Sequence, residues 1–331
     1  MTRHAGLPPK RRALLAALPA LALPGLSRAQ VATSSGWPSR GIRFVVPFAP
    51  GGPVEVPARF IADHLSQRFG RPVIVEAKPG AGGALGVQTV LAARDEHSFV
   101  FTTGSVAILP ALQRNPGYDP FADLMPISIV SEVPLSFLAR PDGRVKDLQG
   151  LLAMAKARPG QISYGSSGVG ATTHLAGELL KVRAGIDLLH VPYRGAAQAV
   201  NALYAGDTDL MVTGLIEGVP HIREGRLRAI GVTSARRSPA APDVPAIAEA
   251  VPGYAMSIWY AIFAPRGTPP EVVELMAREV APLARGTALA QRLEESGGRL
   301  LLDGPAPLAE LMKQEVPMWL EVVQRAGITA E

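Results

Sequence analysis

Short apolar runs rich in β-branched residues alternate along the chain with longer segments of helical periodicity. The first such unit consists of a strand at 42–47, a glycine loop, a helix at 54–69 and a strand at 73–76. The alternation continues to a strand at 229–233, and the tail beyond residue 270 has the periodicity of helices. This pattern predicts an α/β protein in which largely parallel sheets are flanked by helices.

Two extended segments, near residues 131–136 and 250–256, separate the middle third of the chain from the outer thirds. We therefore expect a fold of two lobes that are joined by a double crossover. Lobe 1 is predicted from 30–132 and 255–331, and lobe 2 from 133–254. Ligands of open α/β sheets bind outside the carboxyl ends of the strands, so a cleft between the lobes is the expected site.

The first 29 residues have the layout of a secretory signal peptide, with a basic head, an apolar run at 13–26 and small residues at Ser27 and Ala29. The run is shorter than the roughly 20 residues of a membrane-spanning helix. We expect cleavage before Gln30 and export to the periplasm, by the general secretory or the twin-arginine route. The absence of cysteine excludes disulfides and a lipid anchor on an N-terminal cysteine.

The positive net charge of the chain belongs to this N-terminal segment. The whole chain has 33 Lys and Arg against 28 Asp and Glu, and residues 1–29 hold five basic residues and no acidic one. Without the segment the two signs balance, which removes the argument for nucleic acid or an anionic membrane as a partner. We expect a monomer that carries no cofactor and no metal.

Two glycine loops, each between a predicted strand and a predicted helix, are suited to an anion. Glycines let a ligand approach the backbone closely, and the following helix N-terminus offers unpaired N–H groups. For the first loop, a tight turn without a ligand is the alternative. Because the loops belong to different lobes, together they predict a clamp for a small carboxylate. The assigned ligand-binding residues are Phe48, Pro50, Gly51, Gly52, Ser167, Gly168, Gly170, Thr172 and Thr173, with Ser105 and Thr213 at two further strand ends.

Glu55 has two interpretations. An acid in the first turn of a helix favours the helix dipole and needs no other role. Alternatively, Glu55 points into the cleft, where it pairs with a ligand ammonium or repels acidic groups, and we include it among the ligand-binding residues. Trp259 and Tyr260 lie in an apolar strand that either lines the cleft or fills the core.

No enzyme motif is complete in the sequence. The loop at 165–170 has the spacing of a phosphate loop, but Ala171 stands where that motif needs lysine, and no G-x-S-x-G occurs. His174 and Glu178 share a helical face, and we interpret them as a surface or structural pair rather than as metal ligands. We assign no catalytic residue. The alternative is a hydrolase or isomerase on the same scaffold, since a catalytic set could still assemble in space.

Several short segments, in order from residue 37 to 328, resemble the Bug (Bordetella uptake gene) receptors of tripartite tricarboxylate transporters. They include IRFVVPF at 42–48, PGAGG at 79–83, HLAGEL at 174–179 and HVPYRG at 190–195. The resemblance implies a two-lobed periplasmic binding protein (type II) that captures a dicarboxylate, tricarboxylate, amino acid or aromatic acid. It also implies that the receptor delivers the solute to a membrane permease or, alternatively, that it acts in sensing together with a sensor kinase.

The resemblance further implies that residues 48–55 and 167–174 hold the ligand carboxylate. This chain departs from the family at the first of these loops, where Glu55 replaces a common aspartate and Pro53 replaces a small residue. In the middle of the chain, Thr213 and Gly214 stand where polar residues are common. For these reasons we do not transfer a relative's ligand preference to this chain.

Overall fold

The computed structural model describes residues 36–51, 54–193, 195–295 and 297–328. The predicted signal peptide and its cleavage site lie outside the described residues, as do Gly52 and Pro53 of the first glycine loop. Among the described residues, no helix combines the length and the apolar character needed to cross a bilayer.

The first group of strands is a mixed sheet in the order β2-β1-β3-β9-β4, with β10 on the far side of β4. Its first three strands are parallel, and β9 runs antiparallel to both β3 and β4. The strands are β1 (Ile42–Val46), β2 (Val73–Ala77), β3 (Ser98–Thr103), β4 (Leu124–Ala139), β9 (Ser257–Pro265) and β10 (Arg299–Leu300).

The second group of strands is built around the other end of β4, which pairs with β7 on one side and with β8 on the other. Beyond β7 follow β5 and β6, and these three strands are parallel. The strands that belong to this group alone are β5 (Ser163–Ser166), β6 (Leu189–Pro192), β7 (Leu210–Gly214) and β8 (Arg228–Val232).

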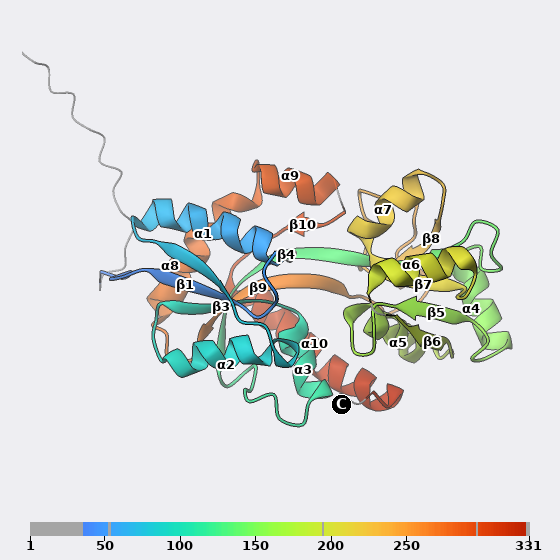
Figure 1. Cartoon of the computed structure of the whole chain (residues 1–331), viewed down its shortest axis with the longest axis horizontal. Coiled ribbons are helices and arrows are strands. Elements are labelled where there is room, and N and C mark those ends of the chain that lie inside the picture. The colour runs from blue at the N-terminus through green and yellow to red at the C-terminus, as the bar shows by residue number, and fades with distance from the viewer. Residues whose placement is uncertain (1–35, 52–53, 194, 296, 329–331) are drawn as a thin grey trace, which may run out of the picture. The chain divides into compact units, whose positions relative to one another are not determined.

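The long strand β4 connects the two groups, as Figure 1 shows. Residues 124–134 of β4 pair with β9, and residues 135–139 pair with β7. The chain returns where the N–H of Met256 donates to the carbonyl of Thr233 at 2.9 Å, just before β9 begins. The predicted double crossover is confirmed. The sequence pattern predicts two separate extended stretches, at 127–130 and 135–139, and this prediction is wrong, because β4 runs through both.

Helices cover the sheets and follow the predicted alternation closely. Two of them, α3 and α7, were not predicted from the sequence, and each contains a proline near its end, Pro110 and Pro220. The helices are α1 (Glu55–Phe69), α2 (Ala84–Ala93), α3 (Ser105–Leu112), α4 (Leu148–Ala157), α5 (Thr172–Ala184), α6 (Ala196–Ala205), α7 (Leu215–Arg223), α8 (Pro270–Val280), α9 (Ala288–Glu295) and α10 (Pro305–Ala326), with short 3-10 turns at Ala81–Gly83, Ile247–Glu249 and Ala281–Ala284.

A continuous apolar cluster reaches from the first group of strands into the second. It contains Val100 of β3, Tyr164 of β5, Trp259 of β9 and Trp319 of α10, all of them buried. Because α10 packs against both α3 and α5, the tail of the chain helps to fix the two groups beside one another. The described residues form one compact unit, and the lobe boundaries at 132/133 and 254/255 stay a prediction.

Candidate functional site

Two adjacent cavities lie where the two groups of strands meet. They measure about 300 Å³ and 650 Å³ and share Phe48, Thr103, Ile108 and Thr172 in their walls, so they are parts of one cleft. The cleft is bounded by the loop after β1, the start of α3, the loop before α5, and residues of β9 and α10.

Three helices begin at this cleft. Val54 and Glu55 bring the start of α1 into its wall, Gly104 and Ser105 bring the start of α3, and Thr172 is the first residue of α5. The first N–H groups of a helix have no partner within the helix and carry partial positive charge. The cleft therefore receives the positive ends of three helix dipoles, an arrangement that favours an anion.

The loop before α5 is held in shape by its own hydrogen bonds. The N–H of Ser167 donates to Oγ1 of Thr173 at 3.0 Å, and the N–H of Gly170 donates to Nδ1 of His174 at 3.0 Å. Gly170 has φ of +74°, which glycine adopts without strain. The first bond of the α5 ladder runs from the N–H of Leu175 to the carbonyl of Ala171. The N–H groups of residues 172–174 precede that bond and stay available to a ligand.

The loop before α1 is closed by Glu55. Its carboxylate accepts the N–H of Gly51 at 2.5 Å and the Nε–H of Arg59 at 2.6 Å. The Gly51 N–H and the Arg59 guanidinium hold the pKa of the Glu55 carboxyl below its ordinary value. Glu55 thus lines the cleft, as one of its two interpretations requires, but its charge is already balanced by Arg59.

We expect Glu55→Gln to weaken ligand binding by roughly threefold to tenfold, because the neutral amide loses the charge-assisted bonds that order the loop. Calorimetric titration with a carboxylate that the wild type binds measures the change in affinity. Glu271→Gln, an exposed acid in the first turn of α8, is the matched control and should leave the affinity unchanged. Equal affinities in the wild type and in Glu55→Gln would show that the loop needs no such closure.

The structure brings only some of the predicted residues into the walls of the cleft. Phe48, Glu55, Ser105, Gly170 and Thr172 line one cavity or both. Thr213 is fully buried and donates its hydroxyl to Glu217 at 2.9 Å. The predicted residues that are described but line neither cavity are Pro50, Gly51, Ser167, Gly168, Thr173 and Thr213.

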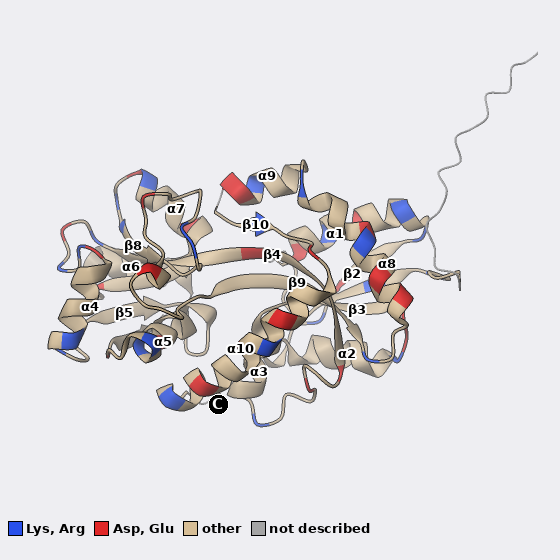
Figure 2. Ribbon diagram, turned by 180° about the vertical axis from the view of Figure 1, so that it is seen from behind, with Lys and Arg blue, Asp and Glu red and all other residues tan. Residues whose placement is uncertain are grey.

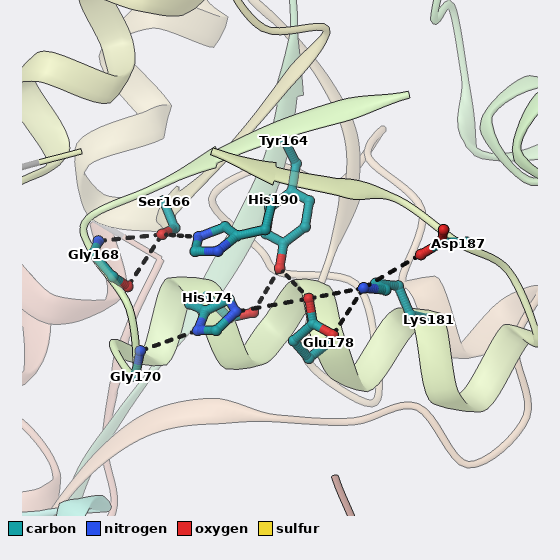
Figure 3. A network of polar contacts seen from close by, with 9 residues as sticks. All are labelled: Tyr164, Ser166, Gly168, Gly170, His174, Glu178, Lys181, Asp187 and His190. Carbon is teal, nitrogen blue, oxygen red and sulfur yellow. Dashed lines mark hydrogen bonds and ion pairs between the residues drawn. The ribbon is translucent and has the colours of Figure 1, made fainter. Parts of the chain in front are cut away.

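A network of buried polar groups supports the loop before α5 from behind, as Figure 3 shows. The rings of His174 and His190 stack with centroids 3.8 Å apart. Nε2 of His190 lies 2.7 Å from Oγ of Ser166, and the Tyr164 hydroxyl donates to Glu178 at 2.7 Å. Of the two predicted alternatives, a surface pair or a structural pair, His174 and Glu178 are the structural pair, because both side chains are buried.

The stacked pair is held in its neutral form. Burial, and after it the charge of Lys181, lower the pKa of His174 to about 4. Burial, and after it the neighbouring His174, lower the pKa of His190 to about 4. Because neutral His174 accepts the Gly170 N–H at Nδ1, the shape of the ligand loop depends on an imidazole that stays unprotonated at neutral pH.

Trp259, Glu315 and Trp319 form a third part of the cleft, and of these residues the sequence had indicated only Trp259. The two indole N–H groups donate to Oε2 of Glu315 at 3.0 Å and 3.1 Å. Burial raises the pKa of Glu315 to about 7, although both indole donors act in the opposite direction. Trp259 was expected to line the cleft or to fill the core, and it does both.

The electrostatics of the cleft rest on backbone dipoles rather than on cationic side chains. No lysine, arginine or histidine occurs among the described residues that line the two cavities. No group of three or more histidine or acidic side chains suited to a metal ion occurs in the described part of the chain. Figure 2 shows basic and acidic residues interspersed over the described elements.

Comparisons with known proteins find a matching family and several similar proteins. Residues 57–328 match the family model of the tripartite tricarboxylate transporter family receptor. Protein BugT of Bordetella pertussis is 33% identical over 299 residues, which cover 88% of this chain and 90% of BugT.

Two solved structures with bound solutes are also similar. Rpa4515 of R. palustris with adipate has a TM-score of 0.71 and 32% identity, covering 89% of this chain and 100% of that one. MatC (Rpa3494) of Rhodopseudomonas palustris with bound malate has a TM-score of 0.69 and 31% identity, covering 87% and 100%. The predicted fold class, a mixed α/β periplasmic binding protein, is confirmed.

Proposed function

The chain belongs to the tripartite tricarboxylate transporter family of receptors, and from this premise we propose that it is a monomeric periplasmic receptor for a small carboxylate. The family consists of binding proteins, and the chain is not an enzyme. The alternative of a hydrolase or isomerase on the same scaffold is therefore set aside.

One observation carries the proposal: three helix N-termini meet at the cleft. No cationic side chain occurs among the described residues that line it. A carboxylate there accepts backbone N–H groups of α5 and the hydroxyls of Thr172 and Ser105. The two loops, including Gly51 and Gly52, shape the clamp and close on the solute. The relatives that were solved with adipate and with malate support a carboxylate as the ligand.

The receptor is proposed to reach the periplasm through its N-terminal signal, with cleavage before Gln30. After the two lobes close on the solute, the receptor delivers it to a membrane permease of the tripartite tricarboxylate type. A sensor kinase that recognises the closed form is the second candidate partner. Mass spectrometry of the exported protein tests the cleavage site directly.

Thermal unfolding in the presence of candidate solutes tests carboxylate capture. A ligand at about 100 times its Kd adds roughly 2.7 kcal/mol to the free energy of unfolding. We expect at least one member of a panel of mono-, di- and tricarboxylates, amino acids and nicotinate to raise Tm, while uncharged sugars and polyols do not. Stabilisation by neutral solutes alone would contradict the proposal.

A further inference from the structure

The smaller cavity of the cleft is mainly apolar. Its wall includes Val46, Ile108, Trp259 and Trp319, which are buried apolar side chains. It is continuous with the helix N-termini through Thr172, which lines both cavities. A solute whose carboxylate lies at the helix N-termini therefore extends its remaining atoms into an apolar chamber.

Glu315 is the acid in this wall whose charge is not balanced. Its side chain is buried at 7% exposure and, among the described residues, forms no ion pair. Both indole donors bind the same oxygen, Oε2, and no described residue donates to Oε1. The other acid of the cavity, Glu55, is paired with Arg59.

A second carboxylate on the solute would enter the same chamber as Glu315. Two like charges repel strongly where water is largely excluded, whereas a hydrocarbon body gains from burial against Trp259 and Trp319. Like-charge contacts of this kind are an effective way to reject an unwanted ligand.

Building on the proposed function, we propose that the cleft selects a monocarboxylate with an apolar body, and that Glu315 excludes solutes with a second carboxylate. The helix N-termini bind the one carboxylate, and the chamber accepts the apolar remainder. The selectivity is therefore for the number of ligand charges, and it is set by a residue on α10 rather than by the two glycine loops.

The charge of Glu315 gives the proposal a distinctive pH dependence. Because the pKa of Glu315 is raised to about 7, its ionised fraction increases between pH 6 and pH 8. Ligand carboxyls, with ordinary pKa values of roughly 4–5, stay largely ionised over this interval. The charged side chain that shares the cavity, Glu55, is held ionised by Gly51 and Arg59. Exclusion of a diacid should therefore be stronger at pH 8 than at pH 6.

Calorimetric titration of the exported protein with two matched ligand pairs tests the proposal. One pair is 4-methylbenzoate and terephthalate, and the other is hexanoate and adipate, each measured at pH 6 and pH 8. We expect the monoacid of each pair to bind roughly tenfold or more tightly than the diacid at pH 8. The ratio should become smaller at pH 6.

Two variants separate the charge of Glu315 from its structural contacts. Glu315→Gln keeps an oxygen that accepts both indole N–H groups, so it should bring the two affinities of each pair together and remove their pH dependence. Glu310→Gln, which changes an exposed acid on the same helix, should keep both the affinity difference within each pair and its pH dependence. If Glu315→Gln does not fold, the pH series of the wild type decides.

Diacids that bind the wild type as tightly as their monoacids overturn the selectivity while leaving carboxylate capture intact. An unchanged ratio in Glu315→Gln overturns the role of that residue. Failure of every carboxylate to bind overturns the proposed function as well, so the two failures are distinguishable.

Discussion

Replacing Trp319 by alanine is expected to lower the free energy of unfolding by roughly 3–5 kcal/mol. The ring is 1% exposed and lies in the apolar cluster that spans both groups of strands. Its removal leaves a cavity between α10 and the rest of the core and takes one of two donors from the buried Glu315. For a chain of this size the loss corresponds to a Tm lower by roughly 6–15 °C.

Two further variants resolve the origin of this effect. Trp319→Phe retains most of the packing and removes only the indole donor, so its expected cost is about 1–2 kcal/mol. Leu320→Ala changes the next residue of α10, which is 48% exposed, and should stay within about 0.5 kcal/mol of the wild type. Denaturant unfolding without ligand measures all three. A Trp319→Ala protein as stable as Leu320→Ala would show that α10 does not anchor the core.

Most of the fold was predictable because its signals are local. Hydrophobic periodicity and glycine punctuation predicted β1, α1 and β2 nearly to the residue, since each element is delimited by residues that start or end it. The errors have local causes as well. Pro110 and Pro220 obscured α3 and α7, because proline in a short apolar run argues against a helix. Pro134 divided β4 in the prediction, but in the structure it is the last residue of β4 that pairs with β9, just before the pairing passes to β7.

The candidate site was predictable only in its loops. Glycines followed by Thr172 indicated a helix N-terminus, and a helix N-terminus at the cleft was found. The acceptors of the loop N–H groups and of the Trp259 indole N–H could not be predicted from the sequence in the same way. Glu55 reaches Gly51 within one turn, and His174 reaches Gly170 likewise, but sequence spacing does not say whether a side chain turns inward. Glu315 meets Trp259 across 56 positions, a contact that only the packing of α10 creates.

Acidification from pH 6.5 to pH 4.5 is expected to lower the free energy of unfolding by about 2 kcal/mol net. Folded His174 and His190 have pKa values of about 4, against about 6.5 in the unfolded chain. The unfolded state therefore binds more protons in this window, and each histidine removes about 2 kcal/mol as the pH falls. Glu315 opposes them, because its pKa of about 7 in the fold favours proton uptake by the native state and restores about 2 kcal/mol.

The double variant His174→Asn with His190→Gln should reverse the sign of this dependence. The new asparagine side chain offers an oxygen to the Gly170 N–H, and the new glutamine side chain offers an amide to Ser166, so neither substitution requires the loop to move. With the stacked pair removed, the contribution of Glu315 outweighs that of His97, whose pKa burial also lowers, and stability should rise by up to about 2 kcal/mol between pH 6.5 and pH 4.5. His174→Asn alone should leave the dependence nearly flat. Denaturant unfolding at several pH values measures the slope, and a double variant that loses stability in acid as the wild type does would contradict the role of the stacked pair.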